Sequence, residues 1–188
     1  MRVQLKFPIL LVLLIDSILL VSPGQRCLLY FDPEDDEKII IFSSDAHLNL
    51  LMRGKHRLMD VTFKSSPKRL CQIYAIHVQA HEIWVPVVIA LLERKTKRTY
   101  ENVVGVLKNT VQEKFNRHLS PLRVSTDFEQ AAISAVTSAF PGSKPSGCLF
   151  HFSQALWRRV QAEGLSEVYR REESEDMRSD FHSLIGRQ

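Results

Sequence analysis

The chain has 188 residues, enough for one domain with a sizeable hydrophobic core. Its composition, 45% hydrophobic and 24% charged, is typical of a globular protein, and its net charge of +4 permits a nucleic-acid partner without requiring one. Three widely spaced cysteines, Cys27, Cys71 and Cys148, exclude a disulfide framework and favour a reducing compartment.

The first 24 residues have the layout of a signal peptide. Arg2 and Lys6 precede an apolar run at 7–21, and small residues at 22–24 could form a cleavage site. The run is shorter than the ~18–20 residues that span a bilayer, and Asp16 adds an insertion cost. The apolar run is consistent with a signal peptide or anchor, with a buried apolar segment, and with an unrelated stretch upstream of the true start.

The next segment predicts a strand and a helix. Residues 28–31 are a short apolar run, and residues 38–42 (KIIIF) are predicted to be a buried strand; the carboxylates of the acidic turn between them, at 32–37, we interpret as solvated. Ser43 or Ser44 is expected to cap a short helix that carries Leu48, Leu51 and Met52 on one face.

Three further strands are predicted at 57–64, 70–78 and 83–92. Their short connections favour an antiparallel meander, in which Pro86 is tolerated only at an edge or a bulge. An amphipathic helix follows at 99–115, because its apolar residues recur at helical spacing.

The remaining elements are predicted to alternate between strand and helix. They are a fourth core strand at 122–125, a helix at 128–140, a break at 141–145, a fifth short strand at 147–150, and a helix at 152–163 capped by Gly164. A charged tail begins near residue 170 and is expected to be a solvated helix or disordered. The whole pattern predicts an α/β fold with a mixed sheet and flanking helices.

Two aspartates, Asp60 and Asp127, fall at or near the ends of the first and fourth core strands. If those strands are neighbours, the carboxylates converge at one edge of the sheet. Carboxylates held in this way can bind Mg²⁺ or Mn²⁺ beside a phosphodiester, because metal-dependent phosphoryl transfer needs hard oxygen ligands. On this pattern alone, aspartates that merely cap turns are the more common case.

Other residues have both a functional and an ordinary interpretation. Cys148 and His151 are two of the four ligands that a structural zinc ion needs, so we interpret them as a structural or accessory motif. Six basic residues are candidates for contacts with DNA phosphates or for solvated surface: Lys64, Lys95, Lys97, Arg98, Arg158 and Arg159.

Residues 28–169 resemble the catalytic domain of Mutator-like element (MULE) transposases. Residues 60–64 (DVTFK) resemble the family's Asp-Gly-Thr-Phe-Lys motif, and 126–129 (TDFE) its second-aspartate motif. Residues 147–154 (GCLFHFSQ) resemble its Cys-x-x-His stretch, and 70–77 and 86–92 the strands between these motifs.

The resemblance implies a ribonuclease-H-like fold and a DDE triad, with Asp60 and Asp127 as metal ligands and DNA as the partner. Val61 departs from the pattern, because the family has glycine there. The family's glutamate follows a helical insertion beyond the Cys-x-x-His stretch and is not found before Gln188. Glu163 lies too close to a helix end to be a good substitute, so we expect an incomplete triad.

Four segments are therefore expected. They are a signal-like or unrelated segment at 1–24, a lead-in strand and helix at 25–56, a ribonuclease-H-like core at 57–165, and a charged tail at 166–188 that begins a truncated insertion. The function implied is that of a transposase-derived protein, ancestrally a Mg²⁺- or Mn²⁺-dependent enzyme of DNA transposition, with little activity as it stands. The family implies a nuclear location, which conflicts with the signal-like N-terminus.

Two alternatives stay open. The first is a domesticated or decaying relic that binds DNA or protein without catalysis. The second is a small secreted or membrane-anchored domain, supported only by residues 1–24. No small-molecule substrate is implied, and a membrane is a partner only if that segment is an anchor.

Overall fold

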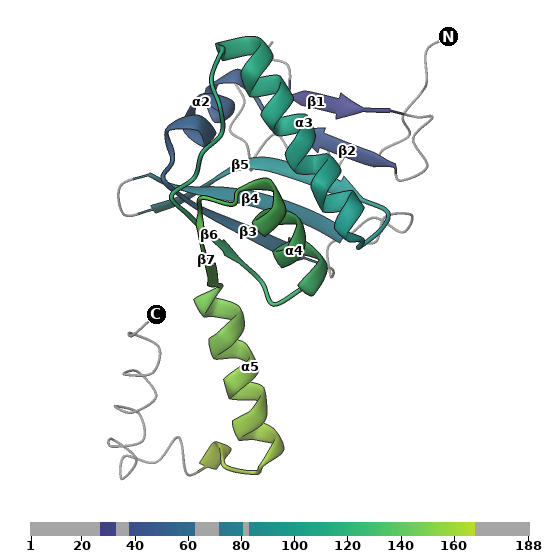
Figure 1. The fold of residues 1–188 in the computed structure, drawn as a ribbon. Coiled ribbons are helices and arrows are strands. Elements are labelled where there is room, and N and C mark those ends of the chain that lie inside the picture. The colour runs from purple at the N-terminus through teal and green to yellow at the C-terminus, as the bar shows by residue number, and fades with distance from the viewer. Residues whose placement is uncertain (1–26, 33–37, 63–71, 81–82, 168–188) are drawn as a thin grey trace. The chain divides into compact units, whose positions relative to one another are not determined.

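The computed structural model describes residues 27–32, 38–62, 72–80 and 83–167 (Figure 1). The strands form one sheet of seven, in the order β1-β2-β5-β4-β3-β6-β7. In chain order the elements are β1 (Leu28–Phe31), β2 (Ile39–Phe42), α2 (Asp45–Arg53), β3 (His56–Thr62), β4 (Gln72–Ala80), β5 (Ile83–Leu92), α3 (Lys97–Phe115), β6 (Arg123–Thr126), α4 (Gln130–Ala139), β7 (Lys144–Gly147) and α5 (Leu149–Ala162). The predicted mixed α/β class, compatible with a ribonuclease-H-like fold, is confirmed.

The chain divides into two compact units, residues 1–145 and 146–188. The sheet from β1 to β6 with α2, α3 and α4 belongs to the first unit, and α5 to the second. The signal-like segment at 1–24 lies outside the described residues, as does the charged tail beyond residue 167. Within the described part of the chain, no helix has the length and apolarity needed to cross a membrane.

The three strands of the predicted meander pair antiparallel in sequence order, β3 with β4 and β4 with β5. A register shift lies between Ile76 and His77, and His77 pairs with Pro86. On the other side of β5, β2 pairs only with Ile89 to Leu92. Pro86 therefore lies in a part of β5 that has no partner in β2, and its partner in β4 is next to the register shift. The missing N–H of Pro86 is tolerated there, as predicted for a proline at an edge or a bulge.

Helices α3 and α4 cover the same face of the sheet (Figure 1). Alternate residues of β3 and β4, such as Met59 and its partner Ile76, belong to one buried cluster with Val104 and Leu107 of α3. Helix α4 contributes the small residues Ala132, Ala135 and Val136 to this cluster, and small side chains allow a close approach to the helix.

One charged side chain is buried on this face. Arg57 of β3 is only 1% exposed, and its Nη2 donates to the carbonyl of Leu51 at 2.8 Å. Its guanidinium carbon lies 5.7 Å from the centre of the Phe140 ring, and burial lowers the pKa of Arg57 to about 10. The guanidinium remains charged at neutral pH, so β3 carries a cation into the core.

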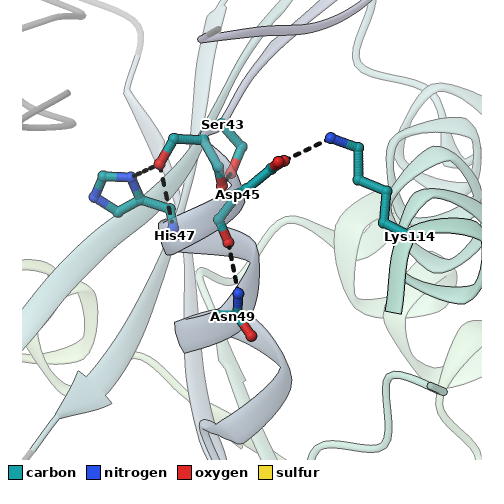
Figure 2. A network of polar contacts seen from close by, with 6 residues as sticks. Ser43, Asp45, His47, Asn49 and Lys114 are labelled. Atoms are coloured by element: carbon teal, nitrogen blue, oxygen red, sulfur yellow. Dashed lines mark hydrogen bonds and ion pairs between the residues drawn. The ribbon is translucent and has the colours of Figure 1, made fainter. Parts of the chain in front are cut away.

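The predicted serine cap begins α2 (Figure 2). Ser44 Oγ accepts a hydrogen bond from the His47 backbone N–H at 3.2 Å, which satisfies one of the free donors of the first turn. Asp45 then binds Lys114 at 2.5 Å and links the start of α2 to the end of α3. This ion pair is exposed, so we expect it to orient the two helices more than it stabilises them.

The prediction of a strand at 147–150 was wrong. Strand β7 ends at Gly147, and α5 begins at Leu149, three residues before the predicted helix start. A short apolar run does not by itself distinguish a strand from a buried helical turn. Pro145, assigned to the break, lies within β7, the last strand of the order, where an edge position tolerates proline.

The predicted glycine cap at the end of α5 is confirmed. Gly164 has a φ of 71°, in the left-handed region that favours glycine. Its N–H donates to Gln161 at 3.1 Å, and the N–H of Leu165 donates to Val160 at 3.0 Å. This pair of bonds is a Schellman motif.

Gly54, at the end of α2, is expected to be required by packing. A Cβ placed there would lie 2.2 Å from Cγ1 of Val78 in β4, so we expect Gly54→Ala to lower the free energy of unfolding by about 1–3 kcal/mol. Gly105→Ala is the control, because a Cβ at that helical position meets nothing within 4 Å and should stabilise α3 by about 0.5–1 kcal/mol. Urea unfolding measures both, and equal effects of the same sign would contradict the packing argument.

Candidate active site

The two aspartates are brought together by the parallel pairing of β3 with β6. The paired residues run from His56 opposite Arg123 to Met59 opposite Thr126. One further step in the same register places Asp60 level with Asp127, which directly follows β6. The expected neighbourhood of the two strands is therefore confirmed, at the ~4.8 Å spacing of adjacent strands, and the convergence of the two carboxylates stays a prediction.

Asp127 is tied to its neighbours in the loop before α4. Its Oδ1 accepts a hydrogen bond from the backbone N–H of Glu129 at 3.4 Å, and its side chain is almost buried. Glu129 is the N-cap residue of α4, but its side chain makes no capping bond. Its Oε2 accepts instead from the Tyr100 hydroxyl at 2.8 Å, so the loop is fastened to α3.

The chain of hydrogen bonds extends from Tyr100 into the sheet. Gln72 of β4 is fully buried, and its Nε2 donates to the Tyr100 oxygen at 2.7 Å. The segment from Asp127 to Glu129 is thus connected through one tyrosine to both α3 and β4. Sequence analysis named Glu129 only as part of the second-aspartate motif at 126–129 and missed Tyr100 and Gln72, since their spacing along the chain gives no sign of contact.

The electrostatics keep the Tyr100 hydroxyl protonated. Burial raises the pKa of Tyr100; the Gln72 hydrogen bond lowers it, while the hydrogen bond to Glu129 and the charges of Glu129 and Asp127 raise it further. Burial also raises the pKa of the neighbouring Tyr74, whose ring centre lies 5.0 Å from that of Tyr100. Tyr100 therefore remains a donor to Glu129 throughout the neutral range.

His77 of β4 is a second residue that the sequence did not connect with the site. It pairs with Leu58, and Asp60 pairs with Ala75, so His77 and Asp60 are diagonal neighbours on one face of the sheet. Burial lowers the pKa of His77, while the negative charge of Asp60 acts in the opposite direction. We expect a neutral imidazole beside Asp60 at pH 7.

A family model described as the MULE transposase domain matches residues 57–155, which is more than half of the chain. The chain belongs to this family. The matched region begins within β3 and ends within α5, and it includes Asp60, Asp127, Cys148 and His151. A search of curated proteins found no match.

In this MULE domain the Cys-x-x-His stretch lies at the start of a helix rather than on a strand. Cys148 is the buried N-cap residue of α5, and His151 is in its first turn. Among the described residues, no group of three or more histidines, cysteines or carboxylates could hold a metal ion. The interpretation of Cys148 and His151 as a structural pair stays a prediction.

The predicted DNA contacts of the MULE domain fall into separate groups. Lys95, Lys97 and Arg98 follow β5, which runs parallel to β3, so they lie beyond the same end of the sheet as Asp60. Lys97 is paired with Glu101 at 3.3 Å. On α5, Arg158 donates to Gln154 and Arg159 pairs with Glu163, each within its own helix, and Lys64 lies outside the described residues.

The donor set fits a divalent cation of the magnesium type. Asp60 and Asp127 supply hard carboxylate oxygens from adjacent strand ends. Mg²⁺ is commonly bound by one or two carboxylates, with water and substrate phosphate oxygens completing its shell, so two carboxylates suffice to hold one ion beside a phosphodiester. The family has glycine at the position of Val61, and the side chain of Val61 lies outside the part of the chain that the structure describes.

The Tyr100 hydroxyl is expected to matter for stability. In Tyr100→Phe the buried Gln72 amide and the Glu129 carboxylate both lose their partner, which should cost about 1–3 kcal/mol in the free energy of unfolding. Tyr74→Phe is the matched control, because its hydroxyl donates at 3.2 Å only to the Met59 sulfur, a weak acceptor. Chemical unfolding of the two variants compares the losses, and a larger loss for Tyr74→Phe would contradict the assigned network.

Proposed function

We propose that this MULE transposase domain binds a divalent cation through Asp60 and Asp127 and takes part in phosphoryl transfer on DNA. The observation that carries the proposal is the parallel pairing of β3 with β6, whose last pair, Met59 opposite Thr126, directly precedes the two aspartates. Membership of the family supports transposase ancestry and makes DNA the expected ancestral partner. A nuclear location follows as part of the same proposal.

Each residue of the site has a defined part in this proposal. Asp60 and Asp127 hold the cation and place its charge beside a DNA phosphate. When bound, Mg²⁺ or Mn²⁺ supplies Lewis-acid stabilisation of the charge that develops on the phosphate oxygens. Tyr100 donates to Glu129, and Glu129 in turn donates its backbone N–H to Asp127, so the loop is held in one conformation.

We further propose that the chain alone has little nuclease activity. Two carboxylates bind one cation, whereas the family's triad has a third. Glu129 is near but is engaged by Tyr100, and no described group of three ligands includes it. Glu163 is the C-cap residue of α5 and pairs with Arg159 at 2.6 Å.

A second candidate function is DNA or protein binding without catalysis. It is favoured by the same incomplete set of described ligands. In that case DNA binding would be sensitive to salt but indifferent to replacement of Asp60 and Asp127. The secreted or anchored alternative depends on residues 1–24, outside the described part of the chain.

Metal binding is the direct test of the proposed site. We expect Mn²⁺ to bind the protein, as measured by calorimetry or by the loss of the electron paramagnetic resonance signal of free Mn²⁺. Asp60→Asn or Asp127→Asn should weaken this binding at least tenfold. The physical reason is the loss of one of two anionic ligands. Asp45→Asn is the control, because Asp45 is an exposed carboxylate paired with Lys114. Equal binding by all four proteins would remove the proposed site.

Strand cleavage tests the proposal about activity. With Mg²⁺ or Mn²⁺ and labelled duplex DNA, we expect no more than slow nicking, because two carboxylates hold one cation and leave the second metal position of the triad unfilled. Rapid Mg²⁺-dependent cleavage that disappears in Asp60→Ala would show that the chain is a complete nuclease.

A further inference from the structure

One end of the sheet carries an exposed aromatic residue among basic ones. At this end β3 and β6 begin, with His56 opposite Arg123, and the hairpin of β4 and β5 turns, with Gln79 opposite Trp84. Trp84 is 39% exposed. We call Lys55, His56, Trp84 and Arg123 the tryptophan end; the apolar residues Ile83 and Leu122 are exposed beside it.

Trp84 is held in place by its neighbours. Its ring meets the His56 ring edge to face, with centres 4.8 Å apart and an angle of 79° between the planes. His56 is fixed in turn by a 2.8 Å hydrogen bond between its Nε2 and Ser125 Oγ on β6. The indole is therefore pre-oriented while partly open to solvent, which is the arrangement of a stacking platform.

Two exposed cations lie at the same end of the sheet as Trp84. Lys55 and Arg123 are both exposed, and their backbones are joined, since the Arg123 N–H donates to the Lys55 carbonyl at 3.1 Å. No carboxylate among the described residues forms an ion pair with either side chain, unlike Lys97, Lys114 and Arg159, which have acidic partners. The charge of Arg123 also acts on His56, whose pKa is lowered first by burial and then by this cation.

His56, and the Trp84 ring that meets it, lie on the same face of the sheet as Asp60. His56 and Asp60 are four residues apart on β3, so their side chains point to the same face. At ~3.3 Å per residue, they are separated by ~13 Å along the strand. A nucleic-acid strand passing Asp60 has to continue only a few nucleotides to reach Trp84.

We propose that the tryptophan end is a second DNA contact, where Trp84 stacks on an unpaired base and Lys55 and Arg123 bind the adjoining phosphates. The combination of an open indole with cations that pair with no described carboxylate matches the recognition of single-stranded DNA, in which bases stack on aromatic rings and a basic surface follows the backbone. This proposal rests on the proposed function, which places the reacting phosphodiester at Asp60 and Asp127. The second contact then falls on the DNA that flanks that bond.

The test of the stacking contact compares two DNA ligands. DNA binding is measured by fluorescence polarisation with the full chain, in Ca²⁺ to prevent turnover. Trp84→Ala should lower the affinity for a duplex with a single-stranded overhang about tenfold and the affinity for a blunt duplex much less. Trp84→Phe should retain most of the affinity because phenylalanine can stack. In a Trp157→Phe background, Trp84 is the only tryptophan, and the overhang should quench its fluorescence.

The test of the basic contact uses charge variants with a matched control. The double variant Lys55→Gln, Arg123→Gln should bind both DNA ligands more weakly. It should also reduce the slope of log affinity against log salt by roughly 1.4–1.8, the value for two lost phosphate contacts. Lys108→Gln with Lys114→Gln removes the same charge from side chains already engaged by the Ala139 carbonyl and by Asp45, and should change the slope much less. Unfolding midpoints equal to that of the unaltered chain show that each variant is folded.

The outcomes separate this proposal from the proposed function. Unchanged affinity, salt slope and fluorescence in the Trp84 and Lys55/Arg123 variants would overturn the second contact, while Mn²⁺ binding that depends on Asp60 and Asp127 would leave the proposed function standing. Loss of blunt and overhang binding to the same extent in Trp84→Ala would overturn the stacking role. Absence of any DNA binding by the unaltered chain at low salt would overturn the second contact and DNA as the partner, whatever the metal titration shows.

Discussion

The pairing of β3 with β6 is the contact on which the candidate site depends. The two strands are separated along the chain by β4, β5 and α3, and they become parallel neighbours only after the chain has crossed the sheet through that helix. Helix α3 makes the crossing favourable because it buries an apolar stripe, including Val103, Val104 and Leu107, on one face of the sheet. The packing of this helix and the proximity of the two aspartates are thus consequences of one arrangement.

A buried polar network then fixes the loop that carries Asp127. Hydrogen bonds in a low-dielectric environment are strong when every member has a partner and costly when one is lost. Here a tyrosine joins Gln72, from the sheet, to Glu129, at the start of α4. The same network engages the Glu129 carboxylate, two residues from Asp127, through the Tyr100 hydroxyl.

The charges along β3 and β6 are distributed unequally. Asp60 and Asp127 lie toward the end where the strands finish, whereas Lys55, His56 and Arg123 lie where they begin. In the proposed DNA contacts, the carboxylates favour a cation beside a phosphate, and the basic residues favour the phosphates that follow. The two kinds of side chain are about 13 Å apart along β3, so one DNA strand can reach both.

The sequence by itself determined the features that depend on near neighbours in the chain. Alternating and helical apolar patterns predicted the meander and α3, and cap chemistry predicted a serine cap at residue 43 or 44 and a glycine cap at Gly164, because each signal involves residues a few positions apart. The family motifs identified Asp60 and Asp127 as candidates. The apolar run at 147–150 was misassigned because a short run has no period that separates strand from helix.

Only the tertiary structure decided which distant residues meet. The bond from Tyr100 to Glu129 joins residues 29 positions apart, and that from His56 to Ser125 joins residues 69 apart. The burial of Arg57 likewise depends on Leu51 and on Phe140 from another part of the chain. Such contacts follow from strand order and register, which are set by burying the whole apolar surface at once rather than by any local pattern.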